Sequence, residues 1–220
     1  GQGVEKDIQK AVALFTLAAT KENSFAAFAL GKLYLAGDAA LPRDPAAALK
    51  WLTYAAELGN QFAQYRLGKL LLKGDDGIPK DVIAAIRWLT AAAKQESGYA
   101  EYALALVYLT GEDAPKDSVK ALSLLKRSAG RGNQFAQYRL GKLLLQGEDA
   151  PKDVKAAIRW LTAAAEQGNQ YAQYALGKLY LLGKEVPKDR SSAIKWFQLA
   201  TDQGNEYAQY FLEHMDDRLG

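Results

Sequence analysis

One stretch of the chain occurs twice letter for letter, and weaker copies of it recur from end to end. It runs from Gly59 to Leu72 and returns from Gly132 to Leu145. One column of mostly small residues returns every 36 or 37 residues, at Gly31, Gly68, Ala105, Gly141, Gly177 and finally Glu213. A period of this length indicates stacked structural units that cannot bury their apolar faces alone. We therefore expect one repeat array, with no segment left over for a separate catalytic domain.

Composition supports a folded chain and narrows the functional classes. Hydrophobic residues make up 49% and charged residues 24%, so disorder is not expected. The net charge of +3 is far from the concentrated basicity of a dedicated nucleic-acid binder. Without cysteine the chain forms no disulfide and no thiolate metal site, and its compartment is left open. We expect no cofactor and no metal, and a monomer as the basic state.

Membrane insertion is not expected either. The chain has no run of 18 or more apolar residues, which a membrane-spanning helix would need. The apolar stretch from Ile8 to Ala19 contains Lys10 and aligns with later repeats. It therefore predicts an ordinary helix rather than a secretory signal.

Two start signals divide each repeat into two helices. The first is a capping asparagine or serine that often follows a glycine, at Asn23, Asn60, Ser97, Asn133, Asn169 and Asn205. The second is an aspartate, in most repeats two residues after a proline, at Asp7, Asp44, Asp81, Asp117, Asp153 and Asp189. Proline ends the preceding helix and aspartate caps the next one. We call the helix after the first signal the A helix and the helix after the second the B helix.

The second full repeat illustrates the predicted helix pair. Its A helix is expected over residues 61–73 and its B helix over 81–94, because apolar residues follow the spacing of an amphipathic helix. Gly68 and its equivalents are expected to let the neighbouring helix approach closely. Trp88 and its equivalents, beside the recurring alanines such as Ala85, are expected to be the large residues that fit against this close-approaching backbone. The sequence thus predicts an all-α fold.

The predicted organisation is a single array over residues 1–220. It has a leading half unit with a B helix, five full repeats and a closing half unit with an A helix: 1–22, 23–58, 59–95, 96–131, 132–167, 168–203 and 204–220. The missing partner of the first B helix indicates an excised fragment. In the last helix Glu213 replaces the glycine and Asp216 and Asp217 replace apolar residues, as expected where an array stops.

The fullest repeat carries a specific pattern of alanine, leucine, glycine, tyrosine, proline, aspartate and tryptophan. Its residues are Ala172, Leu176, Gly177, Tyr180, Gly183, Pro187, Asp189, Ala193, Trp196 and Ala200. This pattern resembles the Sel-one-like repeat, a relative of the tetratricopeptide repeat, over essentially the whole chain. The resemblance implies a right-handed α-solenoid superhelix of stacked antiparallel helix pairs, whose A helices line a concave surface.

The same resemblance implies a function. Such proteins, many of them bacterial, typically act as non-catalytic scaffolds or adaptors that bind proteins or peptides. Some cysteine-rich bacterial members are linked to β-lactam binding or hydrolysis, and this cysteine-free chain departs from them. The last repeats also resemble repeat tails of plasmid-mobilisation relaxases, which implies a nucleic-acid-associated alternative.

A helical wheel places aromatic and lysine columns on the arc of the A helix that faces away from its partner. The candidate partner-binding residues are Phe62, Tyr65, Lys69, Tyr99, Tyr102, Phe135, Tyr138, Lys142, Tyr171, Tyr174 and Lys178. Tyrosine supplies broad contact area at low entropic cost, and lysine attracts an acidic partner or a C-terminal carboxylate. The alternative is that the aromatic columns pack between repeats and the lysines form a solvated face. Interleaved aromatic and basic residues are also typical of single-stranded nucleic-acid binding.

Catalysis is not expected from this sequence. The one histidine, His214, has no serine or cysteine nucleophile motif near it and is expected to be a surface or end-cap residue. Acidic pairs recur in the loop between the A and B helices, at Asp75 and Asp76, Glu112 and Asp113, and Glu148 and Asp149. They lack the ligand spacing of a calcium loop and are expected to be solvated.

Overall fold

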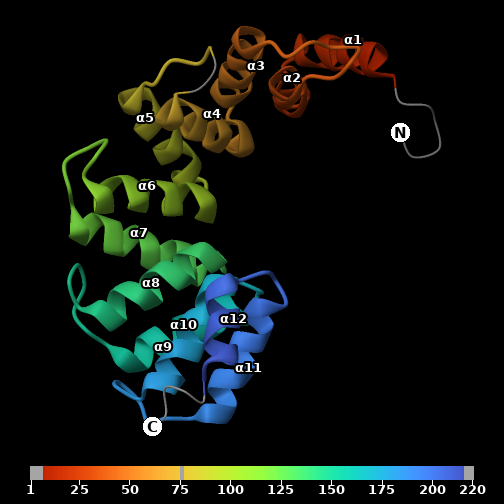
Figure 1. Ribbon diagram of the computed structural model, residues 1–220. Helices are drawn as coiled ribbons and strands as arrows, with labels where there is room; N and C mark the ends of the chain where they lie inside the picture. Colours follow the sequence, from red (N-terminus) through yellow and green to blue (C-terminus); the bar gives the residue numbers. More distant parts are fainter. Residues whose placement is uncertain (1–6, 75–76, 216–220) are drawn as a thin grey trace. The chain divides into compact units, whose positions relative to one another are not determined.

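The computed structural model describes residues 7–74 and 77–215, and over these ranges it contains twelve α-helices and no strand (Figure 1). The B helices are α1 (Ile8–Ala19), α3 (Pro45–Glu57), α5 (Val82–Lys94), α7 (Ser118–Gly130), α9 (Val154–Glu166) and α11 (Arg190–Thr201). The A helices are α2 (Ser24–Ala36), α4 (Gln61–Lys73), α6 (Gly98–Thr110), α8 (Gln134–Gln146), α10 (Gln170–Leu182) and α12 (Glu206–Glu213). The predicted all-α fold is confirmed.

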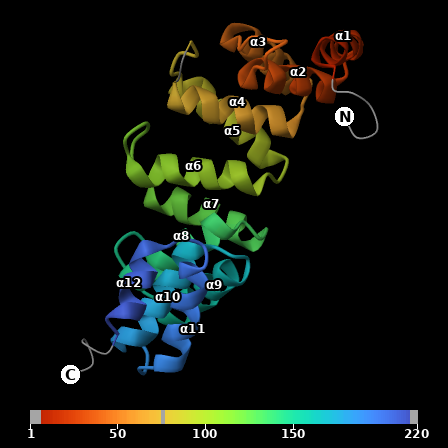
Figure 2. The same ribbon diagram turned by 45° about the vertical axis from the view of Figure 1, so that its right-hand side comes forward.

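The chain forms two compact units, which divide between Pro115 and Lys116. In the first unit α2 packs against α3 and α4 against α5, and in the second α8 packs against α9 and α10 against α11. Each pair is an antiparallel hairpin, which a second view also shows (Figure 2). Neighbouring hairpins stack through α3 against α4 and through α9 against α10. The predicted stack of helix pairs is therefore present in each unit.

All the predicted capping residues lie at helix N-termini. Asn60 Oδ1 accepts a hydrogen bond of 3.0 Å from the Ala63 amide, and Asp81 Oδ1 accepts one of 2.9 Å from the Ala84 amide. The same bond recurs at the other predicted caps. These side chains satisfy amides that have no partner inside the helix, which fixes where each helix begins.

The glycine before the capping asparagine takes the left-handed conformation that was predicted. Gly59 has φ of 84° and Gly132 has φ of 86°. Two repeats reach the same conformation without glycine, since Glu22 has φ of 62° and Glu96 has φ of 67°. A side chain in this region costs about 1–2 kcal/mol, so the stack imposes this turn even where the sequence opposes it.

The glycine inside the A helix marks a close helix approach, as predicted, but the residue that fills the space differs from the prediction. A Cβ atom on Gly68 would lie 2.6 Å from Leu89 Cγ, and one on Gly141 would lie 2.7 Å from Leu161 Cγ. Leu89 is fully buried, whereas the neighbouring Trp88 is half-buried with the Arg87 guanidinium over its ring. Tryptophan was expected to be the large residue against closely approaching backbone, but at this glycine the adjacent leucine takes that place, because the helix turns it toward the partner.

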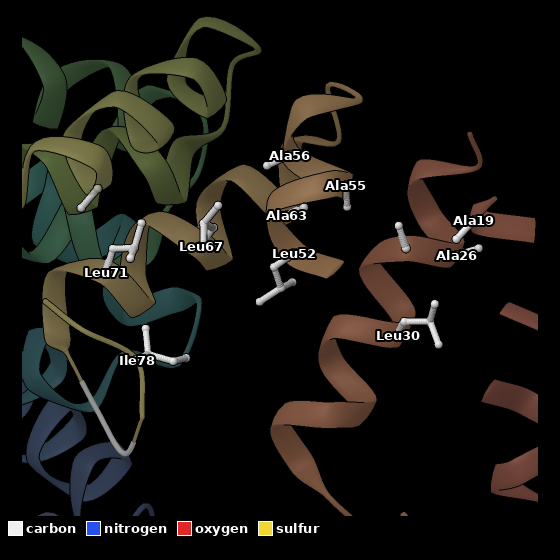
Figure 3. Close-up of a cluster of buried hydrophobic side chains, with 12 residues drawn as sticks. Ala19, Ala26, Leu30, Leu52, Ala55, Ala56, Ala63, Leu67, Leu71 and Ile78 are labelled. Carbon is white, nitrogen blue, oxygen red and sulfur yellow. The ribbon is translucent and has the colours of Figure 1, made fainter. Parts of the chain in front are cut away.

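Buried leucine and alanine side chains make a continuous core through the hairpins of the first unit. Figure 3 shows Leu30, Leu52 and Leu67 within this cluster, together with alanines such as Ala55 and Ala63. The three leucines are at most 1% exposed. Alanine brings the helix backbones close and leucine fills the remaining volume, which gives the dense packing of a protein interior.

A ladder of buried glutamines, which the sequence reasoning missed, joins neighbouring repeats. In the second unit Gln137 donates through Nε2 to the Ala129 carbonyl (3.1 Å) and accepts through Oε1 from Gln167 Nε2 (2.7 Å). Gln173 makes the equivalent pair of bonds with Ala165 and Gln203. The two carbonyls, at the C-termini of the B helices, also accept backbone bonds from Gly132 and Gly168. The side-chain bonds therefore satisfy the buried glutamine amides, which would otherwise carry a desolvation penalty.

Ion pairs link the loops of successive repeats. Lys80 Nζ lies 2.6 Å from Asp113 Oδ1, and Lys116 Nζ lies 2.8 Å from Asp149 Oδ1. Hydrogen bonds from Lys116 and then Ser118 lower the pKa of the Asp149 carboxyl below its ordinary value. The expectation that Asp113 and Asp149 are simply solvated is therefore wrong. The predicted pair Asp75 and Asp76 lies outside the described residues.

Candidate binding surface

The A helices carry an aromatic ladder along each unit. An aromatic ring from one A helix meets a ring from the next, with centroids 5.9 Å apart for Tyr65 and Tyr99 and 6.0 Å apart for Tyr138 and Tyr171. Phe28 meets Phe62 and Tyr174 meets Tyr207 in the same way, each at 6.2 Å. Aromatic pairs at this separation contribute about 0.5–1.5 kcal/mol beyond their buried area. The aromatic columns therefore do pack between repeats.

The ladder nevertheless leaves much of its aromatic area exposed. Phe62, Tyr99 and Tyr171 are each between 55% and 57% exposed, and Phe135 is 43% exposed. The other column is half-buried, at Tyr65, Tyr102, Tyr138 and Tyr174. Burial raises the pKa of the Tyr65 and Tyr138 hydroxyls above its ordinary value. Packing between repeats thus covers one part of each ring and leaves another part in contact with solvent.

The predicted lysines are exposed beside this ladder. Lys69 lies one turn after Tyr65 on α4, and Lys142 and Lys178 lie one turn after Tyr138 and Tyr174 on α8 and α10. We call the exposed and half-buried aromatic side chains of these two columns, together with the exposed lysines, the A-helix surface. Its predicted members are Phe62, Tyr65, Lys69, Tyr99 and Tyr102 in the first unit and Phe135, Tyr138, Lys142, Tyr171, Tyr174 and Lys178 in the second.

In the second unit this surface contains a cavity between α8 and α10, with a volume of about 340 Å³. Four predicted residues line it, namely Tyr138, Lys142, Tyr174 and Lys178. Ala175 also lines the cavity, and the remaining lining residues were not predicted: Leu145, Leu179, Leu182, Lys184 and Glu185. We call this the α8–α10 cavity. Leu145 lies seven residues, about two turns, after Tyr138 on the same face of α8, and this spacing was the signal that could have found it. Leu179 follows Ala175 by four residues, one turn further along α10.

Charge in the α8–α10 cavity is mostly positive. Its carboxylate, Glu185, is already held 2.8 Å from Lys152 Nζ. Within the described part of the chain, Lys142, Lys178 and Lys184 make no ion pair with an acidic side chain. A carboxylate that entered between them would meet amino groups whose charge is not already neutralised.

The single histidine of the sequence lies at the end of the last described helix. His214 follows α12, its Nδ1 lies 2.9 Å from the Tyr210 carbonyl, and its ring stacks on Tyr210 at 4.3 Å. Over residues 7–74 and 77–215 no three histidine, aspartate or glutamate side chains are grouped so as to hold a metal ion. None of the described helices is both long enough and apolar enough to cross a membrane.

A family model described as the Sel1 repeat matches residues 1–23, 24–60, 61–97, 98–133, 134–169 and 170–205. A search of curated protein sequences finds no match. The matched segments together cover all but the last part of the chain, so the family assignment rests on six consecutive repeats rather than on one.

Solved structures agree with this match. A protective antigen of uropathogenic Escherichia coli strains with an SLR fold is 33% identical over 99% of this chain, with a TM-score of 0.87. A Sel1 repeat protein from Oxalobacter formigenes is 33% identical over 97% of this chain, with a TM-score of 0.85. The chain spans 46% and 61% of the lengths of these two proteins. An immunity protein of Pseudomonas aeruginosa, 22% identical over 88% of this chain and 71% of its own, shares the fold alone, with a TM-score of 0.56.

Proposed function

Because the chain belongs to the Sel1 repeat family, we propose that it is a non-catalytic scaffold that binds a protein or peptide partner on the A-helix surface. Sel1 repeat solenoids commonly serve as protein-interaction scaffolds. The observation that carries the proposal is the exposure of the aromatic ladder, since Phe62, Tyr99 and Tyr171 keep more than half of their surface in contact with solvent.

Exposed tyrosine and phenylalanine suit this function for a physical reason. Their rings have few rotatable bonds, so a partner that covers them loses little side-chain entropy and gains a large apolar contact. Neighbouring rings such as Tyr138 and Tyr171 hold each other in place, which lowers the ordering cost further. Lysines beside the rings add electrostatic attraction, which raises association rates and favours acidic partners.

Affinity capture with two matched variants tests the proposal. The first removes exposed members of the A-helix surface by Phe62→Ala, Lys69→Ala, Lys142→Ala and Tyr171→Ala. The control removes exposed B-helix side chains of similar character by Ile83→Ala, Val119→Ala, Lys126→Ala and Lys155→Ala. Truncating an aromatic anchor typically costs more than about 1 kcal/mol, so the first variant should recover about tenfold less partner than the unchanged chain. The control should recover the same amount.

Circular dichroism of both variants checks that helix content is retained, since the substituted side chains are largely exposed. Equal recovery by both variants would show that the partner binds elsewhere on the chain. Loss confined to the B-helix control would place the binding surface on the opposite helices.

A further inference from the structure

We propose that the α8–α10 cavity binds an acidic peptide segment in which a carboxylate side chain lies beside an apolar one. The proposal rests on the proposed function and narrows its partner to one chemistry. Two kinds of group line the cavity: the amino groups of Lys142, Lys178 and Lys184, and the apolar walls of Leu145, Leu179 and Leu182. An acidic and apolar segment matches both.

The charges of the cavity favour an anion. Lys142 and Lys178 come from the same position of two successive A helices, and Lys184 follows the end of α10. Glu185 is engaged by Lys152, outside the cavity lining, so it does not neutralise these lysines. Three like charges around one cavity repel one another, and a carboxylate between them offsets part of that repulsion.

The size and walls of the cavity favour a peptide segment. A volume of about 340 Å³ lies near the lower end of the range of roughly 300–1,000 Å³ typical of ligand pockets. It therefore accommodates one or two side chains rather than a folded domain. The leucine walls gain from burying an apolar side chain, whereas a sugar-phosphate backbone offers them no apolar group.

The full set of three lysines is a local feature rather than a property of every repeat. Lys69 on α4 corresponds to Lys142, but Leu106 on α6 stands in place of Lys178 and Glu112 in place of Lys184. One repeat earlier Lys32 and Lys69 keep the first two lysines, and Asp75 stands at the sequence position of Lys184. A helix pair therefore stacks without these lysines. The first unit also holds one more acidic residue than basic ones, so the chain's excess positive charge lies in the second unit.

Selection from a display library of random twelve-residue peptides, with the full chain as bait, tests the inference. We expect the enriched peptides to place aspartate or glutamate beside leucine, isoleucine, phenylalanine or tryptophan. A fluorescently labelled copy of the most enriched peptide should then bind at least about tenfold more weakly to the variant Lys142→Glu with Lys178→Glu. The variant Lys126→Glu with Lys155→Glu makes the same change of charge on the B helices and should bind as the unchanged chain does.

Three results would overturn the inference. They are enrichment of peptides without acidic residues, no enrichment at all, and equal weakening by the two charge-reversal variants. Labelled single-stranded DNA serves as the competing probe, and DNA binding that is lost only in the Lys142 and Lys178 variant would assign the cavity to nucleic acid instead. If acidic peptides fail while a variant with only Phe62→Ala and Tyr171→Ala still loses the partner in affinity capture, the proposed function stands and only this narrower inference fails.

Discussion

Replacing Leu161 with alanine is expected to lower the free energy of unfolding of the second unit by about 2–5 kcal/mol. Leu161 is fully buried between α9 and α8, beside the glycine at position 141, and belongs to the core with Ala164 and Leu176. Alanine would remove apolar contacts and leave a cavity that the helices cannot close without losing other contacts. Urea unfolding followed by circular dichroism measures the change.

Val119→Ala is the matched control, because Val119 lies on a B helix of the same unit and is 83% exposed. It should change the free energy of unfolding by less than about 0.5 kcal/mol. Equal effects of the two substitutions would contradict the packing that places leucine, rather than the neighbouring tryptophan, between the helices. The free energy of unfolding of a Trp160→Ala variant would then show whether the core depends on Trp160 or on Leu161.

Replacing Gly141 with alanine is expected to cost about 1–3 kcal/mol, although alanine is the better helix former. The added Cβ would lie 2.7 Å from Leu161 Cγ and 3.0 Å from the Ala157 carbonyl oxygen. Leucine can move only by displacing other core residues, and the carbonyl belongs to the backbone of α9. The hairpin must therefore open slightly, which weakens contacts along its whole length.

Gly130→Ala separates this steric effect from helix propensity. Gly130 is also helical, at the end of α7, and a Cβ there would meet no atom within 4 Å. Alanine at this position should leave stability unchanged or raise it by up to about 1 kcal/mol. Urea unfolding that shows Gly141→Ala to be as mild as Gly130→Ala would refute the close approach of α8 and α9.

The sequence was sufficient to predict the helices because their boundaries depend on local chemistry. Asn60 and Asp81 cap the helices that follow them, and Gly59 ends the helix before it, through interactions within a few residues. The glycine at position 68 was also predictable, since a residue without a side chain inside a helix needs a packing reason. Recurrence of each signal in successive repeats strengthened every one of these inferences.

Features that depend on the exact meeting of two helices were harder to predict. Leu89 and Trp88 are adjacent and both apolar, so the pattern alone favoured the larger one, whereas helix rotation buries the smaller. Glutamine is mostly found at protein surfaces, yet the Gln137 side chain is buried against the Ala129 carbonyl. Its recurrence at the same position of other repeats was the signal that could have revealed it.

The candidate site was predicted in part. Helix periodicity placed Tyr138 and Lys142 on one face, and the structure gives both to the α8–α10 cavity. Lys184 and Glu185 come from the loop after α10, and their approach to α8 depends on how the hairpins stack. No pattern within one repeat contains that information, because it arises from the separation between consecutive repeats.

Site-specific photo-crosslinking tests the central claim most directly, namely that the A-helix surface holds the partner. In one variant a photoreactive benzoylphenylalanine would replace Tyr171, which is 55% exposed on α10, and in the other it would replace Val119 on α7. Each variant would then be mixed with cell extract and irradiated. We expect a discrete crosslinked partner from position 171 and none from position 119. A partner crosslinked from position 119 but not from position 171 would contradict this claim.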